Sequence, residues 1–279
     1  MEQITAKTPW AGHTEDIPLH LDYFDGSMFD AVKKAAEQYP DYTAFTFMGK
    51  STNYKTLVAE IEKCARALKT IGVRENDKVT IALPNCPQAI YMFYAVNLVG
   101  AVANMVHPLS AEKEIEFYLN ESESVTAITL DQFYHKFESI RSNTKVVNII
   151  IASVKDALAQ PLKAGYMLTE GRKIRKIPKE APVIRWNEFM RLSRACFYNY
   201  KVERKGEDPA VILYSGGTTG KTKGIVLTNK NFNALGTQII ATNPMFRRAT
   251  RCFRPCPCST ASALACAFIP CCRAPAAAS

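Results

Sequence analysis

A run of ten residues, SGGTTGKTKG at positions 215–224, carries side chains suited to holding a phosphate group. Its four glycines let the backbone approach a ligand closely and adopt positive φ angles. Its serine, three threonines and two lysines supply hydroxyl and ammonium groups that can contact phosphate oxygens beside the backbone amides. The run therefore predicts a phosphate-binding loop, and the elements on either side decide which kind of loop it is.

Two expected strands flank this loop. The segments AVILYS (210–215) and GIVLT (224–228) are rich in β-branched residues, and a helix is expected only afterwards, from Asn229 or Asn231. Residues 215–222 differ from the Walker A pattern GxxxxGK[ST] only at Ser215. A Walker loop, however, opens directly into a helix whose N-terminus receives the phosphates. The strand–loop–strand pattern argues against a P-loop NTPase, which would need a helix starting near Lys221.

Strands and helices alternate upstream of the loop, which predicts an α/β fold with a parallel or mixed sheet covered by helices on both faces. Ser110 is expected to cap the fourth helix, and the polar, basic residues 155–185 are expected to form an irregular connection. The expected helices cover residues 28–38, 53–72, 86–101, 111–122, 131–140 and 184–194, and the expected strands cover 44–49, 78–84, 102–106, 125–130 and 146–153.

The composition is that of a globular protein, with 47% hydrophobic and 22% charged residues. No stretch approaches 18 uninterrupted apolar residues and no secretory signal is visible, so a cytoplasmic location without a transmembrane segment is expected. The net charge is +9, but five arginines lie after residue 243, and subtracting them leaves +4. Basic and aromatic residues are not interleaved, so a nucleic-acid partner is not expected.

The cysteines also gather near the end of the chain. Cys64, Cys86 and Cys196 are scattered singly, whereas the other six lie after residue 251 without a CxxC pair and without a histidine near them. Zinc sites use paired ligands at such spacing, so no metal site is expected.

The loop closely resembles the phosphate loop of the AMP-forming adenylating enzymes, written Y-T-S-G-T-T-G-x-P-K-G, a family that includes the acyl-CoA synthetases. Ser215 stands for the usual threonine, Gly216 for the usual serine and Thr222 for the usual proline. The change at Gly216 removes a hydroxyl, and the change at Thr222 loosens the turn before the last lysine. The matching residues are Tyr214, Gly217, Thr218, Thr219, Gly220, Lys223 and Gly224.

The resemblance extends over most of residues 28–243. It includes the Y-x-x-L helix, the G-V-x-x-x-D-x-V turn, the L-P-N strand end and the G-A-V turn before the next strand. It implies that residues 1–243 are the N-terminal portion of the large AMP-binding domain, with sheets that are incomplete. A sheet left with an apolar edge is expected to aggregate.

The resemblance also implies a chemistry. Family members join a carboxylic acid to ATP, releasing pyrophosphate, and then transfer the acyl group to a thiol such as CoA. A medium- or long-chain fatty acid is the expected substrate, and Mg²⁺ would bridge phosphate oxygens. The residues implied to hold the nucleotide are Ser215, Gly216, Gly217, Thr218, Thr219, Gly220 and Lys223.

Several parts that such an enzyme needs are not found in these 279 residues: the aromatic-Gly-x-[ST]-E segment, the TGD aspartate and the small C-terminal domain with its lysine. We therefore expect the chain as written to be inactive as a ligase. A residual nucleotide-binding module without catalysis is the alternative.

Residues 244–279 turn to arginine, cysteine, proline, serine and alanine without periodicity, and we expect this tail to be disordered. Because codons are degenerate, the DNA that encodes Arg251–Ala267 could also encode the peptide MLSALPMFHGFGLGVC when it is read in a neighbouring frame. That hidden segment resembles the family motif that follows the phosphate loop. A frameshift near residues 244–248, in the gene or in the sequencing, would explain the tail.

Overall fold

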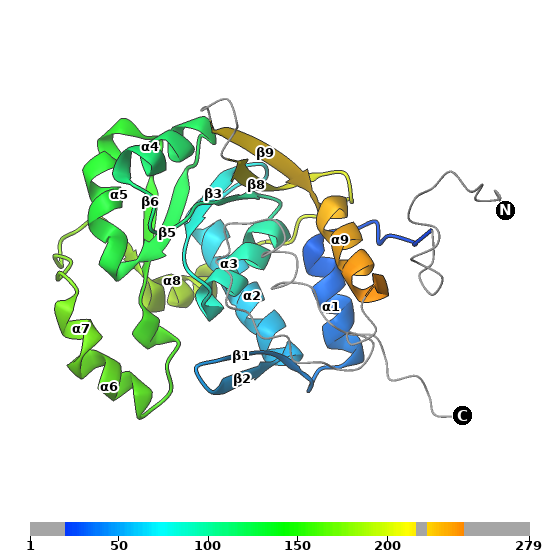
Figure 1. The fold of residues 1–279 in the computed structure, drawn as a ribbon, viewed down its shortest axis with the longest axis horizontal. Coiled ribbons are helices and arrows are strands. Elements are labelled where there is room, and N and C mark those ends of the chain that lie inside the picture. The colour runs from blue at the N-terminus through cyan, green and yellow to red at the C-terminus, as the bar shows by residue number, and fades with distance from the viewer. Residues whose placement is uncertain (1–19, 216–221, 243–279) are drawn as a thin grey trace.

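A computed structural model describes residues 20–215 and 222–242, and its main sheet has seven strands (Figure 1). The helices are α1 (Met28–Gln38), α2 (Tyr54–Thr70), α3 (Pro87–Leu98), α4 (Glu112–Glu121), α5 (Tyr134–Ile140), α6 (Leu162–Leu168), α7 (Glu170–Lys173), α8 (Trp186–Leu192) and α9 (Asn229–Thr242). The strands are β1 (Thr43–Phe47), β2 (Lys50–Asn53), β3 (Lys78–Ala82), β4 (Val102–Met105), β5 (Thr126–Leu130), β6 (Asn148–Ala152), β7 (Ile184–Arg185), β8 (Pro209–Ser215) and β9 (Lys223–Thr228).

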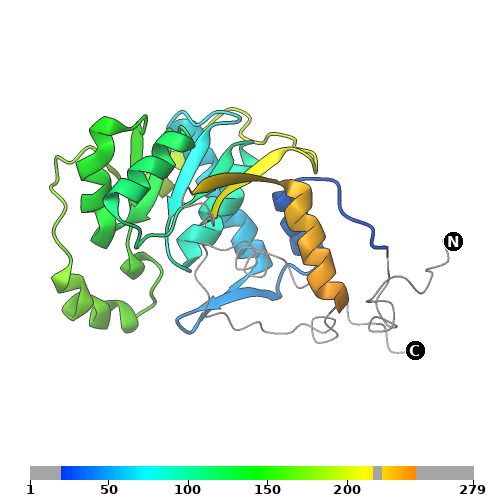
Figure 2. The ribbon, with the colours of Figure 1, turned by 45° about the horizontal axis from the view of Figure 1, so that its top comes forward.

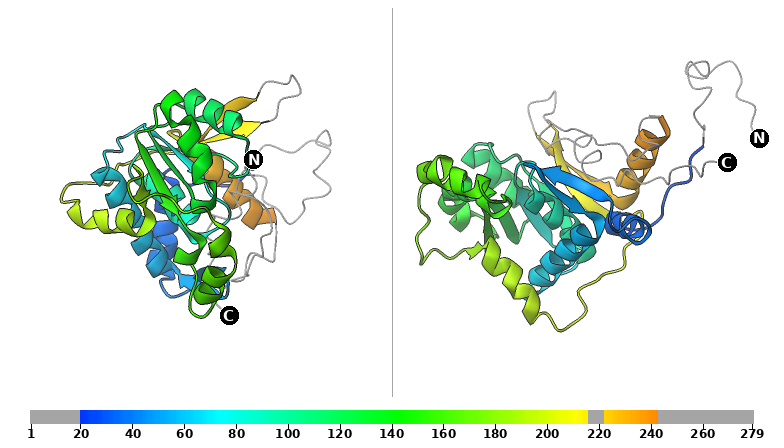
Figure 3. Two further views of the ribbon diagram at one scale, coloured as in Figure 1. Left: turned by 90° about the vertical axis from the view of Figure 1, so that its left-hand side faces the viewer. Right: turned by 90° about the horizontal axis from the view of Figure 1, so that it is seen from below.

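The strand order in the main sheet is β7-β6-β5-β3-β4-β8-β9. Every neighbouring pair from β7 to β8 is parallel, and only β9 runs antiparallel, against β8. The pairing of β4 with β8 joins Ala103 to Val211, more than a hundred residues apart along the chain. β1 and β2 form a separate antiparallel hairpin beside α2 (Figure 3).

Helices cover both faces of the sheet, as expected for parallel strands. The larger core packs α1, α2, α3 and α8 against one face, and the smaller core packs α4 and α5 against the other. Successive residues of β6 alternate between them, since Ile150 lies in the larger core and Ile149 and Ile151 in the smaller. The predicted α/β class, with its parallel-rich sheet between helices, is confirmed.

Local sequence accounts for several helix starts. Ser27 caps α1 in a reciprocal capping box, because its side chain accepts from the Asp30 amide at 3.0 Å and the Asp30 carboxylate accepts from the Ser27 amide at 3.1 Å. Pro87 occupies the first turn of α3, where its missing N–H has no intrahelical partner to lose. Gly72 follows the end of α2 with φ of +91°, a conformation that glycine adopts without strain.

The structure corrects two local expectations. Ser110 does not cap α4: the helix starts at Glu112, and the amide of Ala111 donates to the Glu114 carboxylate at 3.1 Å, which satisfies that end of the helix instead. Residues 155–185 are not wholly irregular, since they include α6, α7 and the short strand β7. None of the residues of α6 or α7 is buried, which explains why hydrophobic periodicity did not reveal them.

Candidate functional site

The predicted phosphate loop joins β8 to β9. These two strands pair in register up to the loop, with Ser215 opposite Lys223 and Tyr214 opposite Gly224. The predicted site residues Ser215 and Lys223 therefore lie side by side at the base of the loop. Residues 216–221 lie outside the described residues, and with them the predicted site residues Gly216, Gly217, Thr218, Thr219 and Gly220.

The two strand ends that the loop joins, Ser215 of β8 and Lys223 of β9, lie where small ligands commonly bind to such sheets. β8 runs parallel to β4 and ends at Ser215, so the loop leaves from the carboxyl end of a parallel strand (Figure 2). Ligands of open α/β sheets bind outside the carboxyl ends of the strands. The position of the hairpin thus agrees with a binding function for the loop.

The element that follows the loop excludes one of the alternatives. A P-loop NTPase requires a helix starting near Lys221, whereas Lys223–Thr228 form β9, which is hydrogen-bonded to β8. The β-branched side chains of this segment favour a strand. No helix N-terminus follows the loop directly, and the P-loop alternative is wrong for this chain.

An aromatic side chain packs across the neck of the loop, where its two strands meet. A Cβ atom on Gly224 would lie 3.2 Å from Cε1 of Tyr214, so the tyrosine ring lies against the bare backbone of the facing strand. The ring of Tyr118 from α4 packs on the ring of Tyr214, with the two ring centroids 4.1 Å apart. The Tyr214 hydroxyl also donates a hydrogen bond to the backbone carbonyl of Tyr118 at 3.1 Å. The neck is thereby attached to α4.

A buried polar cluster lies beneath this aromatic pair. Asn104 of β4, fully buried, donates through Nδ2 to Thr80 at 2.8 Å and to Ser122 at 2.9 Å. Ser124 is within 2.7 Å of both Thr80 and Ser122, which closes the cluster. The cluster links β3 and β4 to the end of α4, and so fixes α4 where it supports the neck.

Burial raises the pKa of the Tyr214 hydroxyl to about 12, and its hydrogen bonds to the polar cluster act in the opposite direction. Burial also raises the pKa of Tyr118, whereas a hydrogen bond with the Thr222 side chain lowers it. Tyr118 therefore contacts both sides of the neck, namely Tyr214 before the loop and Thr222 after it.

Tyr214→Phe is expected to make the free energy of unfolding less sensitive to alkaline pH. Because the folded-state pKa lies above the ordinary value of about 10, the stabilisation is complete below pH 10 and is lost as pH rises towards 12. Urea denaturation at pH 9 and 11 would measure this loss, with Tyr42→Phe as the exposed control. An equal loss in wild type and Tyr214→Phe would contradict the assignment.

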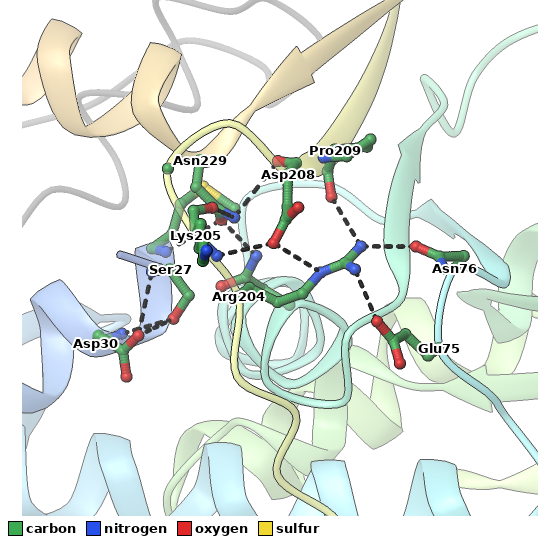
Figure 4. A network of polar contacts seen from close by, with 12 residues as sticks. Ser27, Asp30, Glu75, Asn76, Arg204, Lys205, Asp208, Pro209 and Asn229 are labelled. Atoms are coloured by element: carbon green, nitrogen blue, oxygen red, sulfur yellow. Dashed lines mark hydrogen bonds and ion pairs between the residues drawn. The ribbon is translucent and has the colours of Figure 1, made fainter. Parts of the chain in front are cut away.

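The other end of the hairpin is held by two buried asparagines, Asn97 of α3 and Asn229 at the start of α9. The Oδ1 atom of Asn229 accepts from Nδ2 of Asn97 at 2.7 Å and from the Met28 amide at 3.2 Å. Its Nδ2 donates to the carbonyls of Lys205 at 2.9 Å and Asp208 at 3.4 Å. Asn229 thus joins α1, α3 and α9 to the segment that leads into β8 (Figure 4).

That leading segment is fixed by Arg204, whose side chain is only 7% exposed. Its guanidinium donates to the Glu75 carboxylate at 2.9 Å and to Oδ1 of Asn76 at 2.8 Å, both in the turn after α2 (Figure 4). The Asp208 carboxylate lies 3.9 Å from Nε of Arg204 and accepts from the Lys205 amide at 2.8 Å. Both strands of the hairpin are therefore tied to the core at the end far from the loop.

Sequence reasoning missed these supporting residues. Asn97 had a detectable signal, because it is an amide inside the apolar helix segment YAVNLVG, where a polar side chain must find a buried partner. Tyr118 had none, since an aromatic residue on an amphipathic helix is most simply read as core.

The described residues fit phosphate better than they fit a metal ion. At residues 20–215 and 222–242, no group of three or more His, Cys, Asp or Glu side chains is placed to hold a metal. The base of the loop instead presents the Ser215 hydroxyl and the Lys223 ammonium group. This donor set suits phosphate oxygens, so a Mg²⁺ ion would have to arrive with the phosphates and be held mainly by them.

The fold and the hairpin define an α/β protein whose candidate phosphate loop lies between two strands at the carboxyl edge of a parallel sheet. The family model described as "AMP-binding enzyme" matches residues 32–274. The chain belongs to this family.

Two curated relatives extend the likeness. The chain is 31% identical to the long-chain-fatty-acid–CoA ligase of Bacillus subtilis over 231 residues, which cover 82% of this chain and 41% of the relative. It is 27% identical over 235 residues to the enzyme of the same name from Salmonella typhimurium, again covering 41% of the relative. The chain thus spans about two fifths of the length of these relatives.

Solved structures show the same fold. A long-chain-fatty-acid-CoA ligase from Archaeoglobus fulgidus superimposes with a TM-score of 0.67 at 22% identity, covering 89% of this chain and 46% of that one. A structure from Rhodopseudomonas palustris, described as a putative long-chain-fatty-acid CoA ligase, superimposes with a TM-score of 0.69 at 19% identity. The match covers 90% of this chain and 56% of that one. Across the described residues, no helix is long and apolar enough to cross a membrane.

Proposed function

We propose that the chain is the N-terminal part of an AMP-forming acyl-CoA ligase that activates a medium- or long-chain fatty acid in the cytoplasm. The carrying observation is the β8–β9 hairpin, whose loop keeps the family's glycines, threonines and final lysine on a strand–loop–strand frame. The names of the two curated relatives support the choice of substrate class.

In the proposed reaction, the acid carboxylate attacks the α-phosphate of ATP, pyrophosphate leaves, and the thiol of CoA then takes the acyl group. Ser215, Thr218 and Thr219 would donate hydroxyl hydrogen bonds to the β- and γ-phosphates. Lys223 would add a positive charge beside them, since its place on β9 opposite Ser215 directs it to the base of the loop. Mg²⁺ would supply further charge to the phosphate oxygens when bound. Such preorganised charge lowers the barrier to phosphoryl substitution.

We also propose that residues 244–279 are read in a shifted frame, so that the chain as written does not catalyse the reaction. The support is the hidden segment MLSALPMFHGFGLGVC, which codon degeneracy allows across Arg251–Ala267. The exposed side chains of Ile225 and Val226 on the edge strand β9 would then promote association of the incomplete protein.

The test is to resequence the DNA across codons 240–255 and onward. A gained or lost base that reopens the frame into family motifs would support the proposal. The frame-restored protein should then release pyrophosphate only with ATP and a fatty acid, and should form acyl-CoA when CoA is added. A restored protein that releases no pyrophosphate with any fatty acid would overturn the proposed activity.

If the DNA sequence stands unchanged, the purified chain should be titrated with ATP and Mg²⁺. Measurable binding without pyrophosphate release would favour the second candidate, a residual nucleotide-binding module. This candidate rests on the same hairpin, because the pairing of β8 with β9 by itself places Ser215 opposite Lys223.

A further inference from the structure

The phosphate loop departs from the family pattern at the residue directly before β9. Thr222 stands there in place of the usual proline. A proline would hold its own φ angle at about −65°, whereas threonine leaves that angle free to vary. Another contact at this position is therefore needed if the end of the loop, with Lys223, is to be held in place.

Tyr118, in the last turn of α4, supplies such a contact. A hydrogen bond joins its side chain to the Thr222 side chain, on the β9 side of the neck. On the β8 side, the centroid of its ring lies 4.1 Å from that of Tyr214. One side chain from a helix thus contacts the chain on both sides of the loop.

The main chain that carries the Tyr118 ring is fixed by the core. Its carbonyl accepts hydrogen bonds from the Ser122 hydroxyl at 2.7 Å and from the Tyr214 hydroxyl at 3.1 Å. Asn104, fully buried in β4, also donates to this carbonyl, with Nδ2 at 3.4 Å. The ring therefore has a defined place before any ligand enters the loop.

We propose that Tyr118 is a positioning residue for phosphate binding, and that its pairing with Thr222 replaces the proline of the family loop. This inference rests on the proposed function, because it takes the loop between β8 and β9 to hold phosphate. Tyr118 acts through Thr222 and Tyr214, and not by touching the nucleotide. These two residues adjoin Lys223 and Ser215, which pair at the base of the loop.

Proline is compatible with the backbone at position 222. The φ angle of Thr222 is not positive, and the residue precedes Lys223, the first paired residue of β9. Removing the N–H of residue 222 therefore breaks no hydrogen bond of the ladder. If the proline and the hydrogen bond serve the same purpose, each makes the other dispensable. A tyrosine that only fills space would show no such dependence on residue 222.

The test is a double-mutant cycle on the 279-residue chain, with wild type, Tyr118→Phe, Thr222→Pro and the double variant. The first readout is amide hydrogen exchange at the start of β9, Lys223–Ile225, measured by NMR. Tyr118→Phe should speed this exchange about fivefold, as expected for one lost hydrogen bond. In the Thr222→Pro background the same change should speed it by less than about twofold. Thr222→Pro alone should exchange within about twofold of wild type.

The second readout is the dissociation constant for ATP in the presence of Mg²⁺. Tyr118→Phe should raise this constant about fivefold, and adding Thr222→Pro should restore it. Lys223→Ala should raise it at least about tenfold in every background. Tyr198→Phe is the matched control, because it also removes one tyrosine hydroxyl, which donates to the Lys69 carbonyl of α2 at 2.8 Å. This control should change neither readout.

An equal effect of Tyr118→Phe in the two backgrounds at residue 222, or no effect in either, would overturn the inference. If ATP binding by these variants still depends on Lys223, the proposed function stands and only the role of Tyr118 is lost. If wild type binds no ATP, the residual nucleotide-binding module is overturned together with the positioning role of Tyr118. Coupling in both readouts supports the inference.

Discussion

Asn229→Ala is expected to lower the free energy of unfolding by about 3 kcal/mol, since each lost hydrogen bond in a buried site costs about 1 kcal/mol and the partners are left unpaired. The Asn229 side chain is fully buried and joins four groups: the Met28 amide, the Asn97 amide group and the carbonyls of Lys205 and Asp208. Alanine would leave these groups without that partner in a buried site.

Urea denaturation followed by circular dichroism and by the fluorescence of buried Trp186 would measure this change. Asn231→Ala is the matched control, because Asn231 is exposed and, among the described residues, its Oδ1 accepts from Thr228 alone, through the amide at 2.8 Å and the hydroxyl at 3.1 Å. The control should cost less than about 1 kcal/mol. If the two variants are equally stable, Asn229 does not hold these elements together.

Lys223→Ala in the frame-restored protein is expected to lower kcat/KM for ATP about 10- to 100-fold. A charge-assisted hydrogen bond to a phosphate is worth about 1.5–3 kcal/mol, which corresponds to this range. None of the ion pairs among residues 20–215 and 222–242 involves Lys223, so its loss should not disturb the fold.

Initial rates of pyrophosphate release at varied ATP concentration would give kcat/KM, and Lys223→Arg should retain part of the activity. Lys230→Ala provides the control, because Lys230 lies in the first turn of α9, beyond the end of β9 that is far from the loop, and pairs with Glu207 at 2.8 Å. It should keep kcat/KM for ATP within about twofold, as expected for an exposed ion pair. A Lys223→Ala enzyme with unchanged kcat/KM would remove this residue from the phosphate site.

The elements with strong local patterns could be predicted from the sequence. In α2, apolar residues recur at helical spacing, and in α3 a proline, Pro87, occupies the first turn. The segments that form β5 and β6 are rich in β-branched residues. The strand–loop–strand reading of residues 210–228 is likewise confirmed by β8 and β9. These features depend on near neighbours in the chain, and each is encoded within about twenty residues.

The supporting contacts could not be predicted in this way, because they join distant segments. The pairing of Asn97 with Asn229 spans 132 residues, and the Tyr214 contact with Tyr118 spans 96. Each side chain by itself fits several environments, and only the tertiary fold selects one. The nucleotide-binding roles of all seven predicted site residues stay predictions. Ser215 and Lys223 pair at the base of the loop, and the other five, Gly216, Gly217, Thr218, Thr219 and Gly220, lie outside the described residues.

The hydrogen bond between the first residue of α1 and Asn229 has a consequence for synthesis on the ribosome. The Met28 amide and its acceptor are 201 residues apart. At a translation rate of about 5–20 residues per second, the acceptor emerges about 10–40 s after the donor. Similarly, the edge of β4 that pairs with β8 stays without its partner strand until β8 has been synthesised. The contacts of α1 with α2 and α3 can form early, whereas its hydrogen bond to Asn229 completes the packing of this first helix only after most of the described residues have been synthesised.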